Sequence, residues 1–130
     1  MKQDDKELLY KDLSSRLPYG TVVECSIESG ESIDLILTTS HIDELLNESL
    51  IIKPYLRTLD SMTKEERKER LSFFQIVELN SGLTPLLSAL KSFEYIDWLN
   101  AHQFDYHGLI PMGLAIEVTK ENNPYEKIKL

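Results

Sequence analysis

The sequence predicts a single α+β domain that combines a small antiparallel sheet with two main helices. Apolar and polar residues alternate over residues 21–37, whereas apolar residues recur at helical spacing within 64–79 and 92–102. We expect both helices to pack on or beside the sheet. The chain has 130 residues and a hydrophobic content of 42%, which suffices for one core. We place the domain in residues 1–119 and a polar C-terminal tail in residues 120–130.

A short helix is expected over residues 4–14, where leucines recur on one side and aspartates stand near the start. Pro18 then ends it. The predicted hairpin follows, with one strand that turns Val23 and Cys25 to the same side and a second strand that ends near Leu37. We interpret the cysteine as a small buried hydrophobic residue.

Between the hairpin and the first main helix, the sequence predicts one more helix and one more strand. Ser40 is expected to cap a short helix that ends near Leu46. An apolar group follows at residues 50–52, but Pro54 lacks a backbone N–H donor. A strand here is therefore expected to lie at an edge of the sheet or to end at Lys53.

The two main helices have different start signals. Thr63 and Glu66 form a capping box, the pattern that opens the helix predicted from residue 64. Pro85 is expected at the first position of a short helical turn that includes Leu86 to Leu90, and Ser92 is placed to cap the second main helix. Residues 114–118 alternate again and are expected to form a last strand.

The charge balance argues against direct binding to nucleic acid or to an anionic membrane. The chain has 22 acidic and 14 basic residues, which gives a net charge of −8. Cys25 is the only cysteine, so no intrachain disulfide can form. The sequence has no signal-peptide pattern and no apolar run of the roughly 20 residues that a membrane span needs. We therefore expect a soluble cytoplasmic protein without membrane association.

The segment from Ser92 to Ile110 concentrates large and titratable side chains, including the only tryptophan and two of the three histidines. Tyr95, Trp98 and His102 have the spacing of one helical stripe. Such a stripe can bind a partner, since tryptophan and tyrosine dominate interface hot spots. The alternative is that it packs in the core, which the large area of an indole ring favours for Trp98. The candidate partner-binding residues are Tyr95, Trp98, Tyr106, Lys53, Tyr55 and Arg57.

His102, Asp105 and His107 offer two imidazoles and a carboxylate, a sensible ligand set for zinc or iron. Their spacing matches no established metal motif. The simpler interpretation places His102 at a helix C-terminus and gives Asp105 turn hydrogen bonds. His41 is interpreted as part of a helix cap or as surface charge. We therefore assign no catalytic residue, no cofactor and no metal, and keep the His–Asp–His trio as an alternative.

Five segments carry a resemblance: Leu17-Pro-Tyr-Gly20, Ile52-Lys-Pro-Tyr-Leu-Arg57 with Ser61-Met-Thr-Lys-Glu-Glu66, and Ile96-Asp-Trp-Leu-Asn-Ala-His102 with Phe104-Asp-Tyr-His-Gly-Leu-Ile110. They resemble an uncharacterised family of small proteins from gut Bacteroidales and their phages or prophages. The resemblance covers about half of the chain. It implies a genomic setting and no activity. His107 stands where an arginine is expected in that family, which weakens the metal interpretation further.

The leading functional hypothesis is a non-enzymatic accessory or protein-interaction protein of a phage or mobile element. One alternative is a metal-dependent protein or enzyme that uses His102, Asp105 and His107. Another is an acidic mimic of nucleic acid that binds a basic host protein. A mimic would need carboxylates along one face, whereas the run from Lys64 to Arg70 mixes both signs of charge. The sequence does not identify the partner, the oligomeric state or the strand order.

Overall fold

The computed structural model describes residues 2–27, 30–47, 50–79 and 85–127, and within the two long helices it describes side chains only up to Phe73 and from Ser92. The fold is α+β, as predicted, but its sheet is mixed rather than wholly antiparallel, with strands in the order β2-β1-β3-β4. The strands are β1 (Val22–Ser26), β2 (Ser32–Ile36), β3 (Ile51–Leu56) and β4 (Ile116–Glu117). The helices are α1 (Gln3–Arg16), α2 (Thr39–Leu46), α3 (Lys64–Leu79), α4 (Pro85–Ala101) and α5 (Pro124–Lys127). Two 3-10 turns, η1 (Leu17–Tyr19) and η2 (Leu59–Ser61), complete the chain.

The predicted hairpin is confirmed as β1 and β2, and it forms one side of the sheet. β1 pairs antiparallel with β2 on one edge and with β3 on the other. The short β4 joins β3 in parallel and confirms the strand expected at 114–118. The alternation turns Val23 and Cys25 toward the same face, and register places Ile52 opposite Cys25.

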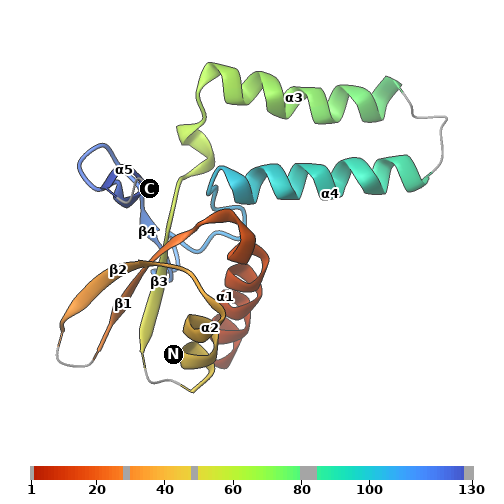
Figure 1. The fold of residues 1–130 in the computed structure, drawn as a ribbon. Coiled ribbons are helices and arrows are strands. Elements are labelled where there is room, and N and C mark those ends of the chain that lie inside the picture. The colour runs from red at the N-terminus through yellow and green to blue at the C-terminus, as the bar shows by residue number, and fades with distance from the viewer. Residues whose placement is uncertain (1, 28–29, 48–49, 80–84, 128–130) are drawn as a thin grey trace.

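The helices α1 and α2 cover one face of this sheet (Figure 1). Leucines 9 and 13 of α1 are fully buried there. With Ile42 and Leu45 of α2 they pack against Val23, Cys25 and Ile52 in the main core. Cys25 is therefore a buried hydrophobic residue, as the sequence indicated.

The long helices α3 and α4 form an antiparallel hairpin that extends away from the sheet, so the helices that cover the sheet are not the two predicted main ones (Figure 1). Among the described side chains of this helical hairpin, those buried against the body lie at its root, where they include Glu66, Leu99 and Asn100. The sheet face is already covered by the apolar sides of α1 and α2, and the charged first turns of α3 lie at the root, where Glu66 pairs with Arg57.

The predicted helix from residue 64 is confirmed, and so is its capping box. The Thr63 backbone N–H donates to Glu66 Oε1 at 2.9 Å, and the Glu66 N–H donates to Thr63 Oγ1 at 3.1 Å. The turn expected from Pro85 and the second main helix form one helix, so Ser92 lies within α4 rather than at its N-cap. Proline suits the first helical position because its missing N–H is not needed there.

The cap of α2 also differs from the expectation. Thr38, rather than Ser40, is the N-cap, and its extended backbone (φ −131°, ψ 170°) allows this. The His41 side chain completes the capping box, with the Thr38 N–H donating to His41 Nδ1 at 3.0 Å. The interpretation of His41 as part of a cap is confirmed.

β3 neither ends at Lys53 nor lies at an edge, which corrects the expectation drawn from Pro54. The strand runs on to Leu56 between β1 and β4. Pro54 lies opposite Val23 in a non-hydrogen-bonded pair, so β1 needs no N–H donor from it. On the other side β4 begins only opposite Tyr55, so the missing N–H of proline removes no ladder bond.

Part of the segment predicted as a polar tail packs on the sheet through α5. Pro124 is buried, and the hydroxyl of Tyr125 accepts a hydrogen bond from the Val22 N–H at 3.1 Å. The same hydroxyl donates to the carbonyl of Tyr55 at 2.6 Å. It therefore bridges β1 and β3 at the end of their ladder. Within the described ranges, no helix combines the length and apolar character that crossing a membrane requires.

Candidate functional site

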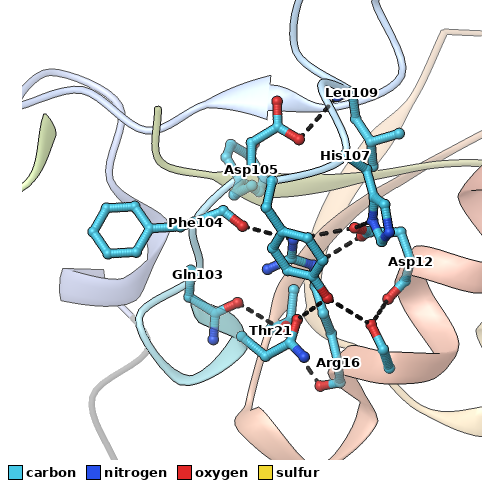
Figure 2. A network of polar contacts seen from close by, with 12 residues as sticks. Asp12, Arg16, Thr21, Gln103, Phe104, Asp105, His107 and Leu109 are labelled. Atoms are coloured by element: carbon cyan, nitrogen blue, oxygen red, sulfur yellow. Dashed lines mark hydrogen bonds and ion pairs between the residues drawn. The ribbon is translucent and has the colours of Figure 1, made fainter. Parts of the chain in front are cut away.

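A network of buried polar side chains connects α1 with the end of α4 and the loop that follows (Figure 2). At its centre Asp12 and Arg16 lie one helical turn apart and are both fully buried. The Arg16 Nε and Nη2 atoms donate to the Asp12 carboxylate at 2.8 and 3.1 Å. Nη2 also donates to the carbonyl oxygen of Phe104 at 2.7 Å. We call this set, together with the partners described next, the Arg16 network.

His107 makes the Asp12 carboxylate a shared group. Its Nδ1 lies 2.7 Å from Asp12 Oδ1, so one carboxylate serves both an imidazole and a guanidinium. The guanidinium carbon of Arg16 lies 5.1 Å from the centre of the Tyr106 ring, within the range of a cation–π contact. Of the buried side-chain atoms in the described part of the chain, Nη1 of Arg16 alone has no hydrogen-bond partner.

The second half of the network holds the end of α4 against β1. Gln103 adopts a left-handed backbone with φ 62°. Its Nε2 donates to the carbonyl of Tyr19 at 2.9 Å, and its Oε1 accepts from Thr21 Oγ1 at 2.6 Å. The Tyr106 hydroxyl donates to Asn100 Oδ1 at 2.8 Å. These bonds satisfy polar groups that would be costly to bury alone, and they fix how α4 enters the body.

Aromatic rings fill the root of the helical hairpin. The Trp98 ring lies 4.6 Å from that of His102, 5.6 Å from Phe104 and 6.1 Å from Phe73, measured between centroids. Its Nε1 donates to Glu69 on α3 at 2.8 Å. Trp98 thus packs between the two helices and stays half-buried.

An ion pair ties the end of β3 to the start of α3. Arg57 donates from Nη1 and Nη2 to the two carboxylate oxygens of Glu66, at 2.8 and 2.7 Å. The Arg57 guanidinium carbon also lies 4.4 Å from the centre of the Phe104 ring. The hydrogen bonds from Arg57 lower the pKa of Glu66 most, burial opposes them, and the hydrogen bonds with Thr63 lower it further, to about 2.

The three candidate metal ligands are directed to different partners. His102 Nδ1 lies 2.9 Å from the carbonyl oxygen of Trp98, and His107 contacts Asp12. Asp105 accepts two backbone N–H groups from the following turn, at 2.8 and 2.9 Å, as the simpler interpretation expected. Among the residues described, no group of three or more His, Cys, Asp or Glu side chains is placed to hold a metal ion.

The candidate partner-binding aromatics do not form one surface. Tyr95 lies with Trp98 between α3 and α4, where its hydroxyl accepts from Arg70 Nε at 2.8 Å. Tyr106 belongs instead to the Arg16 network. Their apolar area is therefore largely used inside the molecule.

The candidates on and after β3 are divided between one face of the sheet and the hairpin root. Tyr55 is buried, and its hydroxyl donates to Asp34 Oδ1 at 2.9 Å. Lys53 is half-buried opposite Glu24 on the same face, away from α1 and α2. Arg57 lies at the hairpin root and is engaged by its carboxylate partner.

One feature of the sequence indicates the centre of the Arg16 network. Asp12 and Arg16 have i, i+4 spacing and share the side of α1 that carries Leu9 and Leu13. Charged residues on the apolar side of a helix must be paired to be buried. That rule marks both residues as buried and partnered, although it does not identify Phe104 or His107.

The side chains of the Arg16 network bond mainly to one another, which limits the chemistry that they can perform on a ligand. Asp12 and His107 are an acid–base pair, but the two hollows of about 410 Å³ described on the surface are lined by other residues. Arg16, Asn100 and Gln103 hold the joint between α1 and α4. The chain matches no protein-family model, and comparison with curated proteins and with solved structures found no significant match either.

Proposed function

We propose that the protein is a non-enzymatic protein-interaction protein that binds its partner through the projecting helical hairpin. The observation that carries this proposal is the exposure of Phe93 (67%) and Ile96 (41%) on α4. We call these two residues the hairpin face. They lie one helical turn apart, on the side of α4 that Tyr95 and Trp98 leave free when they turn toward α3.

The position of the hairpin face favours a binding role over incomplete packing. Asn100, seven residues beyond Phe93, shares its side of α4 and is buried against the body. The same side of the helix is therefore covered near the root and open further out. Large apolar side chains in such a position are typical of surfaces that another protein covers.

We further propose that the protein is an accessory protein of a phage or mobile element of gut Bacteroidales. This part rests on the resemblance of residues 52–66 and 96–110 to that family. An accessory binding role agrees with the net charge of −8, which disfavours direct contact with nucleic acid.

Affinity capture from a lysate of gut Bacteroidales tests the proposal. The bait proteins are the wild type, the double variant Phe93→Ser/Ile96→Ser, and Met112→Ser as a control. Met112 is similarly exposed (47%) but lies far along the chain from the hairpin face. Circular dichroism first verifies that each variant is folded.

A protein retained by the wild type and by Met112→Ser, but lost with the double variant, would support the proposal. Retention of the same proteins by all three baits would refute the role of the hairpin face. Capture of no protein above background would contradict the interaction function in that host.

A further inference from the structure

The second exposed feature of the molecule is the outer edge of β2. β2 is the terminal strand of the sheet, and all five of its residues are exposed. No described segment pairs with its outer side. Its sequence, Ser-Ile-Asp-Leu-Ile, has neither the lysine nor the proline with which proteins commonly protect such an edge.

The register determines which backbone groups this edge offers. Leu37 donates its N–H to the carbonyl of Thr21 at 2.8 Å, so odd-numbered residues of the second strand face β1. Backbone groups alternate in direction along an antiparallel strand. The N–H and C=O groups of Ser32, Asp34 and Ile36 therefore point outward, in position to bond another strand.

The two faces beside this edge differ in chemistry. On the face that carries α2, Ile33 (59% exposed) and Leu35 (39% exposed) line a hollow of about 410 Å³ together with Ile27 and Leu50. On the other face, Asp34 lies opposite Glu24 of β1. The hollow suits apolar side chains, and the carboxylates suit basic ones.

We infer that the edge of β2 binds an extended segment of another protein, in which apolar and basic residues alternate, as an added antiparallel strand. Successive side chains of a strand point to opposite faces, so such a segment places apolar groups in the hollow and cations beside Asp34. Lys53 of β3 lies on the far side of Glu24, so Asp34 is the carboxylate closest to the incoming strand. Its Oδ1 accepts from the Tyr55 hydroxyl at 2.9 Å, and the charge of the group remains to attract a cation.

Charge distinguishes this occupant from a second copy of the chain. A symmetric antiparallel pair centred on β2 brings Asp34 opposite its own copy, and like charges placed directly opposite each other are destabilising. Two molecules with a net charge of −8 each also repel one another. The inferred surface is separate from the hairpin face, so either proposal can fail alone.

The first test uses the wild-type protein and fluorescein-labelled heptapeptides, with binding measured by fluorescence anisotropy. One peptide alternates lysine and valine, and a second alternates glutamate and valine. In an antiparallel pair, the residue opposite Asp34 directs its N–H toward β2, and that residue is a lysine. We therefore expect binding of the lysine–valine peptide alone, and loss of binding when its lysine amides are N-methylated.

The second test exchanges charges across the edge. Asp34→Lys should weaken binding of the lysine–valine peptide by about tenfold or more and admit the glutamate–valine peptide. Ile33→Ser should weaken binding of the lysine–valine peptide, because Ile33 lines the hollow. Asp60→Lys, an equally drastic change at an exposed aspartate of η2, should leave binding unchanged.

The following results would overturn the inference. Wild-type protein that binds neither peptide lacks the proposed preference, and undiminished binding of the N-methylated peptide would mean that no strand is added. A wild-type dimer that Ile33→Ser converts to a monomer in sedimentation would assign the edge to a second copy. The N-methylation result needs no variant, so it decides the question even where a substitution prevents folding.

Discussion

Replacing Glu66 by glutamine should remove a calculable part of the stability of the fold. Glu66 accepts hydrogen bonds from both terminal nitrogens of Arg57 and from the Thr63 backbone, and these lower its pKa from 4.5 to about 2. At about 1.4 kcal/mol per pH unit, the ionised carboxylate stabilises the folded state by about 3 kcal/mol at neutral pH. Glutamine resembles the protonated carboxyl group in shape, so Glu66→Gln should cost about that amount.

The pH dependence follows from the direction of this shift. Because the pKa of Glu66 is lower in the folded than in the unfolded state, its stabilisation is complete above pH 4.5 and is lost as the pH falls toward 2. The difference between wild type and Glu66→Gln should therefore fall from about 3 kcal/mol at pH 7 to about half that value near pH 3.

Urea unfolding at both pH values measures this difference. Fluorescence of Trp98, the only tryptophan, reports on the hairpin root, and far-UV circular dichroism reports on the whole fold. Glu65→Gln is the matched control, because Glu65 is also in the first turn of α3 but is exposed. Equal destabilisation by the two substitutions, or a Glu66→Gln effect that does not change with pH, would refute the reasoning.

Three further predictions concern the buried groups. Asp12→Asn leaves the Arg16 guanidinium and His107 without their carboxylate and should cost about 3–5 kcal/mol in urea unfolding; a loss below 1 kcal/mol would mean that the ion pair adds little. Tyr125→Phe removes the hydroxyl that bridges two strands and should cost about 1–3 kcal/mol, whereas the exposed Tyr10→Phe should be neutral. Burial raises the pKa of the Cys25 thiol, so a thiol-exchange reagent should react with it much more slowly in native than in urea-unfolded protein; equal rates would contradict its burial.

The parts of the fold that could be predicted from the sequence have local causes. The alternation around Val23 and Cys25 determines which side of the strand is buried, and the contacts of Thr63 with Glu66 span only three residues. The two helix starts expected at Pro85 and Ser92 belong to one helix, α4, because Ser92 is as good a cap by composition as Pro85 is a first residue. Local patterns alone do not choose between two such signals.

The candidate site depends on contacts that no local pattern encodes. Arg16 donates to the Phe104 carbonyl 88 residues away, and Tyr125 reaches Val22 across 103 residues. The concentration of aromatic residues between Ser92 and Ile110 correctly indicates a packed region, since Phe104 lies at the centre of the hairpin root. The sequence could not assign the histidines, because the partner of His107 is on α1.

The buried Asp12–Arg16 ion pair lies at the joint between α1 and the end of α4, where its geometry affects the direction of the helical hairpin. A hydrogen bond requires a particular distance and angle, whereas apolar contacts tolerate sliding. Arg16 bonds both α1, through Asp12, and the loop that ends α4, through Phe104, so it restricts the direction in which the helical hairpin leaves the body. Replacing the pair with apolar residues of similar size would then preserve stability better than it preserves this direction. The hairpin face on α4 and the edge of β2 lie in separate parts of the molecule (Figure 1), so substitutions at one surface should leave binding at the other unchanged.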